Sequence, residues 1–486
     1  MFFTKNRQIF LLFQPVLTLF EKISPQFPRA GLTGLLILTC VGHSRLPLHA
    51  DQDSFAFSRA PSSDPTLQVV VHLKVSGKMR SAATNTPKVR ETPLQVTGNF
   101  VYQQKFLEST KSSVTRSIRC YETAKATIQI AEHQFESTLA KNQFITHISK
   151  QGQSTLVSPT GPLRREQLDL IDIPANSAFL HFLLPEHPVK IGESWPHDQT
   201  ALAALLGIDV ISQTDVQTEL NSVDNNILTL VTSGAIDGSV EGVATDIKIN
   251  VNSSFDITSQ QFATSVWKIE ENRSIGHAAP GFQVTAQVDI KLRPSKNREL
   301  LSERVLKELP QHEVTSSLLQ FTARQGGFGF LHARNWHVIV DQKEVTVLRF
   351  VQRGDLVAQC NLSRLPKQSK NQTFSLEKYQ TDIATSLGEN FGQFLETSQT
   401  TTEDGLEIMR IVASGQVADL TIHWIYYHLE DSQGRRISLV FTYEEKFTER
   451  FLGQDDSIIG SFEFFADQWE SERTAANETT ESATGR

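Results

Sequence analysis

The chain has 486 residues, of which 39% are hydrophobic and 21% are charged, and its net charge is −8. This balance is typical of a globular protein and excludes a wholly disordered chain. The negative charge and the lack of a basic cluster argue against nucleic acid or anionic lipid as a partner. The length is sufficient for two or three domains.

An apolar run near the amino terminus predicts export. Arg29 supplies a positive flank, and residues 30–42 form an apolar core shorter than the roughly 20 residues that a membrane span requires. A polar stretch then ends at Leu48-His-Ala50, which predicts signal cleavage between Ala50 and Asp51. We therefore expect a periplasmic or extracellular protein with no stable transmembrane anchor after cleavage.

Two features of the leader, residues 1–50, leave alternatives open. A second apolar run at residues 9–20 is interrupted by Pro15, and a start codon near residues 16–19 explains it more simply than a membrane hairpin. Cys40 ends Ile-Leu-Thr-Cys, which loosely matches a lipobox, although Thr39 stands where Gly, Ala or Ser is required. Lipoprotein anchoring through Cys40 is thus the alternative to a plain signal peptide.

Only Cys120 and Cys360 remain after cleavage. They lie in different predicted domains, so we expect two buried free thiols, with a disulfide in an oxidising compartment as the alternative. Stability then comes from the burial of large cores rather than from covalent links.

Residues 51–64 are polar and predict a tether, and residues 65–293 predict a curved antiparallel sheet. Val284, Val288 and Leu292 recur on one face of a strand whose other face is polar, which is typical of a half-buried strand. Similar alternation predicts strands at residues 67–75, 94–102, 126–130, 226–232, 246–252, 264–270 and 283–292. Residues 201–206 predict a short helix, and Trp195 is interpreted as buried packing rather than a ligand-stacking residue.

Residues 294–321 predict a helical linker, because Leu301, Val305, Leu306 and Leu309 fall on one helical stripe before a proline. Residues 322–465 predict a second domain, and residues 466–486 predict a disordered acidic tail. The strands of the second domain are expected at residues 336–340, 345–351, 356–362, 406–413, 419–429 and 436–443. Helices are expected at 375–387, capped by Ser375, and within 444–462.

This order of elements, closed by Ile459-Gly-Ser-Phe462, resembles the PsbP-like fold of photosystem extrinsic subunits. The first block weakly resembles the half-barrels of periplasmic lipoprotein carriers of the LolA type, through sheet length and export alone. The predicted fold class is therefore α+β: a large curved antiparallel sheet domain, then a smaller α/β sandwich with a PsbP-like antiparallel sheet. Both resemblances imply a binding module and transfer no functional residue.

No motif in the sequence specifies a reaction, so we predict no catalytic, cofactor-binding or metal-binding residue and no enzyme. The pairs His423/His428 and His332/His337 are each five positions apart, which places the members on opposite faces of a strand. Cys360 is the best available nucleophile, but a buried strand thiol is the preferred interpretation.

The predicted function is that of an exported non-catalytic binding or structural protein of the cell envelope, whose partner is an unknown protein or an amphiphile. One alternative is a carrier that holds a lipid or other amphiphile on the concave face of the first sheet. Val284, Val288 and Leu292 would then line an open cavity. The other alternative is a hydrolase with a dispersed active site.

Overall fold

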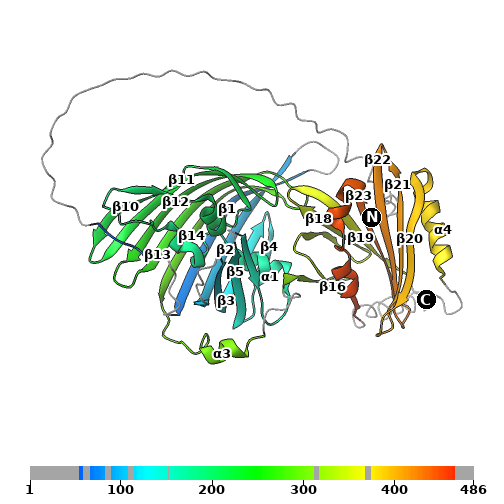
Figure 1. The fold of residues 1–486 in the computed structure, drawn as a ribbon, viewed down its shortest axis with the longest axis horizontal. Helices are drawn as coiled ribbons and strands as arrows, with labels where there is room; N and C mark the ends of the chain where they lie inside the picture. Colours follow the sequence, from blue (N-terminus) through cyan, green and yellow to red (C-terminus); the bar gives the residue numbers. More distant parts are fainter. Residues whose placement is uncertain are drawn as a thin grey trace, which may run out of the picture.

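The computed structural model describes residues 54–58, 66–82, 89–107, 114–150, 153–310, 317–323, 325–366 and 374–465. The predicted signal peptide with its cleavage site at Ala50 and Asp51, Cys40 and the acidic tail lie outside these residues. The described part contains a large curved antiparallel sheet followed by a smaller antiparallel sheet, which confirms the predicted fold class (Figure 1). None of the helices in this part has the length and apolar character needed to span a bilayer.

The large sheet has 13 strands, and its first and last strands pair at its centre. β1 and β14 are antiparallel over their whole length, with Leu67 opposite Pro294. The order is β6-β5-β3-β2-β1-β14-β13-β12-β11-β10-β8, with β4 paired to β3 and β9 paired to β11. The bounds are β1 Leu67–Ala82, β2 Val89–Leu107, β3 Val114–Ile130, β4 His133–Thr138, β5 Gln143–Lys150, β6 Gln153–Val157, β8 Ser194–Pro196, β9 Val210–Thr214, β10 Gln217–Asp224, β11 Ile227–Val240, β12 Val243–Asp256, β13 Gln261–Arg273 and β14 Gly281–Pro294.

The concave face of this sheet is filled by side chains. Inward positions of the strands pack against α1 (Arg165–Ile171), η2 (Ser177–Leu183) and α2 (Gln199–Leu206) in one apolar core. Val288 is fully buried in that core, and Leu292 packs against it. At Val288 and Leu292, the open cavity that the carrier alternative requires is therefore occupied by protein, whereas the half-buried Val284 is not part of this core.

Trp195 is a packing residue, as predicted. It is buried, and its indole Nε1 donates a hydrogen bond to the carbonyl of Leu183 at 2.9 Å. Within the predicted tether, the Phe57 ring lies 5.3 Å from that of Phe255, and the main chain of Phe55 bridges to Val189. Residues 54–58 are thus attached to the core of the large sheet.

The linker helix α3 (Glu303–Glu308) is shorter than the predicted stripe of residues 297–309. Leu301, Leu306 and Leu309 nevertheless pack with Ile118 and Cys120 on the outer face of β3. Three of the four residues of the predicted stripe therefore pack together, but Leu301 and Leu309 lie outside the helix and Val305 is not in this cluster.

The smaller sheet has seven strands in the order β17-β18-β19-β23-β22-β21-β20. Helix α4 (Leu376–Leu387) covers one face, and the short helices α5 (Thr448–Phe451) and α6 (Asp456–Gly460) lie on the other (Figure 1). The bounds are β17 Trp336–Asp341, β18 Val345–Gln352, β19 Asp355–Leu365, β20 Phe391–Thr401, β21 Glu407–Val417, β22 Leu420–Glu430 and β23 Arg436–Glu444. Edge strand β20 was not predicted, because it is largely exposed and polar.

A third, four-stranded sheet links the two larger ones. Its order is β24-β16-β15-β7, and β7 (Leu163–Arg164), which directly precedes α1, runs parallel to β15 (Leu319–Thr322). The remaining strands are β16 (Phe328–His332) and β24 (Glu463–Phe464). Main-chain hydrogen bonds therefore already join the first block of the chain to the second.

The two cysteines are free and buried, as predicted. Burial raises the pKa of Cys120 to about 11 and places that of Cys360 well above its ordinary value. A thiol that does not ionise near neutral pH is a poor nucleophile. Cys360 is therefore unsuited to the catalytic role that the hydrolase alternative assigned to it.

Candidate functional site: a polar junction between the two sheets

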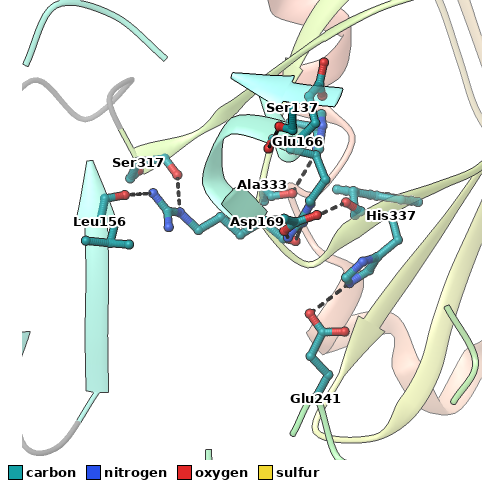
Figure 2. A network of polar contacts seen from close by, with 12 residues as sticks. Ser137, Leu156, Glu166, Asp169, Glu241, Ser317, Ala333 and His337 are labelled. Carbon is teal, nitrogen blue, oxygen red and sulfur yellow. Dashed lines mark hydrogen bonds and ion pairs between the residues drawn. The ribbon is translucent and has the colours of Figure 1, made fainter. Parts of the chain in front are cut away.

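Several ionisable groups with perturbed pKa values gather where α1 meets the start of the smaller sheet. Figure 2 shows Asp169 of α1, Glu241 of the turn between β11 and β12, and His337 of β17 close together. Clusters of perturbed pKa values mark candidate functional sites, although structural ion networks produce them too. The hydrogen bonds of the junction decide between these two interpretations.

Two arginines form a reciprocal clasp across the junction. Arg165 of α1 donates through Nη2 to the main-chain carbonyls of Arg334 and Trp336, which lie beside the smaller sheet. In return, Arg334 donates through Nη2 to the carbonyl of Leu156 in β6 and through Nε to that of Ser317, at 3.0 Å for the latter (Figure 2). The Nη2 groups of both arginines and Nε of Arg334 thus donate to main-chain acceptors of the neighbouring segments, whereas Nε of Arg165 is buried without a partner among the described residues.

Two hairpin turns also touch across the junction. Gly242 lies so close to Gly354, in the turn between β18 and β19, that a Cβ atom on Gly242 would stand 2.1 Å from the Gly354 Cα. Nearby, Arg349 Nη1 donates to the carbonyl of His277 at 2.5 Å. Only glycine at this turn permits such an approach of two backbones.

The carboxyl groups around α1 are held in surroundings that disfavour their charge. Partial desolvation by the surrounding protein raises the pKa of Asp169 to about 6 and also raises the pKa values of Asp172, Asp209 and Glu241, although all four side chains keep contact with solvent. Arg165 offsets this only weakly, because its Nη1 lies 3.9 Å from Asp169 Oδ1. The arginines therefore neutralise the region without binding these carboxylates closely.

His332 and His337 both lie in the junction, but on different strands. The sequence analysis placed them on one strand, which is wrong: β16 ends at His332, and the chain turns before β17 begins at Trp336. Burial lowers the pKa of each to about 4, so both are neutral at neutral pH. His337 Nε2 lies 3.6 Å from Glu241 Oε1. Among the described residues, no three His, Cys, Asp or Glu side chains form a group that could hold a metal ion.

A second polar cluster lies under the large sheet and attaches η2 to it. The buried Arg119 of β3 donates through Nε to Gln104 Oε1 at 3.0 Å and through Nη2 to Asn176 Oδ1, and its guanidinium lies 4.9 Å from the Tyr102 ring centre. Asn176 is also the N-cap of η2, since its side chain accepts from Ala178 N. These contacts fix the covering segment by hydrogen bonds to one buried cation.

The arrangement most similar to a hydrolase site lies beside this cluster. His147 Nε2 and Ser154 Oγ are 2.5 Å apart. Burial, with a contribution from Arg119, lowers the pKa of His147 to about 3. A general base works best with a pKa near the operating pH, so His147 is poorly matched to activate a hydroxyl at neutral pH.

Sequence reasoning did not identify Arg119, Arg165, Arg334 or Glu241. Each is a single charged residue whose partners are distant in the sequence, and no motif surrounds it. Gly242 is the one available signal, since a glycine between two stretches of strand pattern is typical of a turn or bulge, but its contact with Gly354 depends on the arrangement of the two sheets.

No known protein family and no curated protein matches the chain. Among solved structures, CyanoP, the cyanobacterial PsbP of Synechocystis sp. PCC 6803, is 17% identical with a TM-score of 0.26 and covers 32% of this chain and 99% of its own. The Ran-binding protein Mog1p of Saccharomyces cerevisiae is 8% identical with a TM-score of 0.25 and covers 31% and 96%.

A third solved structure matches over more of the chain. The translocator domain of the autotransporter NalP from Neisseria meningitidis is 7% identical with a TM-score of 0.13 and covers 78% of this chain and 88% of its own. Part of the chain is thus similar to PsbP, as the sequence analysis stated. Likenesses of this low degree carry no argument about function.

Proposed function

We propose that the chain is an exported, non-catalytic scaffold protein of the cell envelope that presents two sheets to a binding partner in one fixed orientation. The observation that supports this proposal is the clasp at the junction. Arg165 donates to carbonyls beside the smaller sheet, while Arg334 donates to Leu156 and Ser317 on the other side.

The clasp matters because it is energetically demanding. Burying charged and polar groups costs free energy unless each finds a partner, and two modules that act separately need only a flexible linker. A junction in which two half-buried arginines, Arg165 and Arg334, each donate to main-chain carbonyls of another segment is expected where function depends on the relative orientation of the parts. Export through the predicted signal peptide and cleavage after Ala50 belong to the same proposal.

The two alternatives have weaker support. A carrier requires open space under the large sheet, where Val288 and its neighbours are packed instead. A hydrolase requires an activated nucleophile, whereas the thiol of Cys360 has a strongly raised pKa and the His147 imidazole has a pKa of about 3. The scaffold proposal uses the charged groups of the junction in the roles that their hydrogen bonds indicate.

The test compares the exported parent protein with the double variant Arg165→Ala/Arg334→Ala. We expect mass spectrometry to find Asp51 at the amino terminus of the parent, and mild cross-linking of the cell envelope to recover the parent in a defined complex. The double variant should keep its circular dichroism spectrum and lose the complex. Arg90→Ala, which removes an arginine from the exposed end of β2, serves as the matched control.

Two results would overturn the proposal. One is a complex that forms equally well with the double variant, which would show that orientation is irrelevant. The other is turnover of an ester or amide substrate that is lost in Ser154→Ala, which would establish the hydrolase alternative.

A further inference from the structure

A furrow crosses the outer face of the large sheet, on the side opposite the packed core. Its volume is about 460 Å3, and residues of five strands, β1 and β11 to β14, line it. An outer sheet face is usually covered by its own side chains, so a hollow of this size has a local cause.

The register of the strands explains the hollow. Ile247, Glu271, Val284 and Gly77 are consecutive cross-strand neighbours. The first three point their side chains to the inner face and Gly77 has none, so only the backbone of this row forms the floor. The rows on either side point outward and form the walls. One wall is Ala235, Lys248, Glu270, Thr285 and Ser76, and the other is Asp237, Asp246, Asn272 and Gln283.

The walls carry an excess of negative charge. Three acidic residues, Asp237, Asp246 and Glu270, point outward into the furrow. Lys248 is the only lysine or arginine among the residues that line it. Glu270 is paired with Lys268 at 2.6 Å, whereas Asp237 and Asp246 stand directly opposite each other on β11 and β12. Like charges in such a pair destabilise a sheet, and a cation placed between them would relieve the repulsion.

We propose that this furrow binds an extended segment of a partner protein that carries cationic side chains. The biological role of this segment rests on the proposed scaffold function. Five strands spaced about 4.8 Å apart give the furrow a length of about 19 Å, which matches about six residues of extended chain. The amide group of Gln283 supplies a donor and an acceptor for a peptide backbone, whereas that of Asn272 already bonds Arg80 and Asp246. The small residues Gly77 and Ala235 leave room for the peptide.

The experiment measures the binding of two fluorescent peptides to the purified exported protein by anisotropy. One peptide is a Lys-Thr repeat and the other is a Glu-Thr repeat of equal length. We expect the Lys-Thr peptide to bind, the Glu-Thr peptide not to bind, and added salt to weaken binding. The isosteric double variant Asp237→Asn/Asp246→Asn should weaken binding about tenfold or more, because it removes both opposed charges.

Asp289→Asn is the matched control. Asp289 points outward from β14 but lies outside the furrow, so its removal should leave peptide binding unchanged. Equal binding by the parent and the double variant, or equal binding of both peptides, would refute the furrow as the site. Complete competition by spermidine at an equal concentration of positive charge would show that the furrow binds a small polyamine. It would refute the proposal that the furrow binds an extended peptide.

The failures of the two proposals are distinguishable. If the double variant Asp237→Asn/Asp246→Asn still forms the envelope complex, the furrow is not the partner site, while the scaffold function stands. If the parent forms no complex, the scaffold function fails regardless of what the peptides do.

Discussion

The interior of the large sheet and the junction between the sheets differ in both chemistry and exposure. Under the sheet, residues such as Trp267, Phe255 and Phe179 pack in an apolar core. At the junction, the half-buried Arg165 and Arg334 lie among histidines and carboxyl groups that keep contact with solvent, such as Asp169. Apolar burial is non-directional, whereas each junction donor needs one particular carbonyl. The core therefore defines each fold, and the junction defines how the folds are placed.

This difference separates two kinds of sensitivity. A core tolerates substitutions that conserve volume, but it loses much stability when a large side chain is removed. A polar junction tolerates little change in geometry, yet each of its contacts contributes only modestly to net stability. Variants that affect one region and not the other therefore test whether the core and the junction differ in this way.

The largest effect is expected in the core. Trp267→Ala removes a fully buried indole whose Nε1 donates to Ser265 Oγ at 2.8 Å. We expect unfolding in denaturant to show that the free energy of unfolding falls by about 3 to 5 kcal/mol relative to the parent. Val266→Ala is the control, since the preceding residue faces outward and is 42% exposed. Similar losses for both variants would show that the inner face is not the main source of stability.

A smaller effect, confined to the junction, is expected for Gly242→Ala. The new Cβ would stand 2.1 Å from the Gly354 Cα, in a backbone with φ of +73°. The turns must then separate, which we expect to expose the junction to limited proteolysis while each sheet stays folded. The total loss of stability should be about 1 to 3 kcal/mol.

Gly192→Ala separates the clash from the backbone strain. Gly192 has a similar φ of +82°, but a Cβ there would meet no other atom within 4 Å. Gly192→Ala should lower the free energy of unfolding by about 1 kcal/mol through backbone strain alone, and it should leave the proteolysis pattern unchanged. If both variants open the junction equally, the contact between the two turns is not what holds it.

The same division explains what the sequence predicts. Alternation of apolar residues reports burial locally, so β14 and the buried face of α4, with its Ser375 cap, were predicted correctly. The exposed strand β20 has no such pattern, because its pairing with β21 comes from main-chain hydrogen bonds that any side chains permit. Sequence reasoning therefore identifies strands that have a regular apolar face and misses strands without one, among them the inner strands β5 and β10 as well as the edge strand β20.

The junction and the furrow escape prediction for a further reason. Arg334 acts on Leu156, which is 178 positions away, and the furrow exists because Gly77 is the cross-strand neighbour of Val284. Neither relation leaves a local pattern, since both arise only when the register and the placement of the sheets are fixed.

The smallest effect is expected for Arg334→Ala, and it tests how the junction works. β6 is the last strand at one edge of the large sheet, so the outward carbonyl of Leu156 has no neighbouring strand to bond and receives the Arg334 guanidinium instead. Arg334→Ala leaves the carbonyls of Leu156 and Ser317 without this donor. The free energy of unfolding should therefore fall by about 1 to 2 kcal/mol.

The arginine also offsets the effect of burial on Asp172, since its charge acts to lower the pKa of that carboxyl. Arg334→Ala should therefore raise this pKa further and shift proton uptake by the folded protein to higher pH, which titration of the carboxyl followed by NMR would detect. Arg90→Ala should change neither stability nor this titration. If Arg334→Ala also left both unchanged, the clasp would be a consequence of the two sheets meeting rather than a cause of their placement.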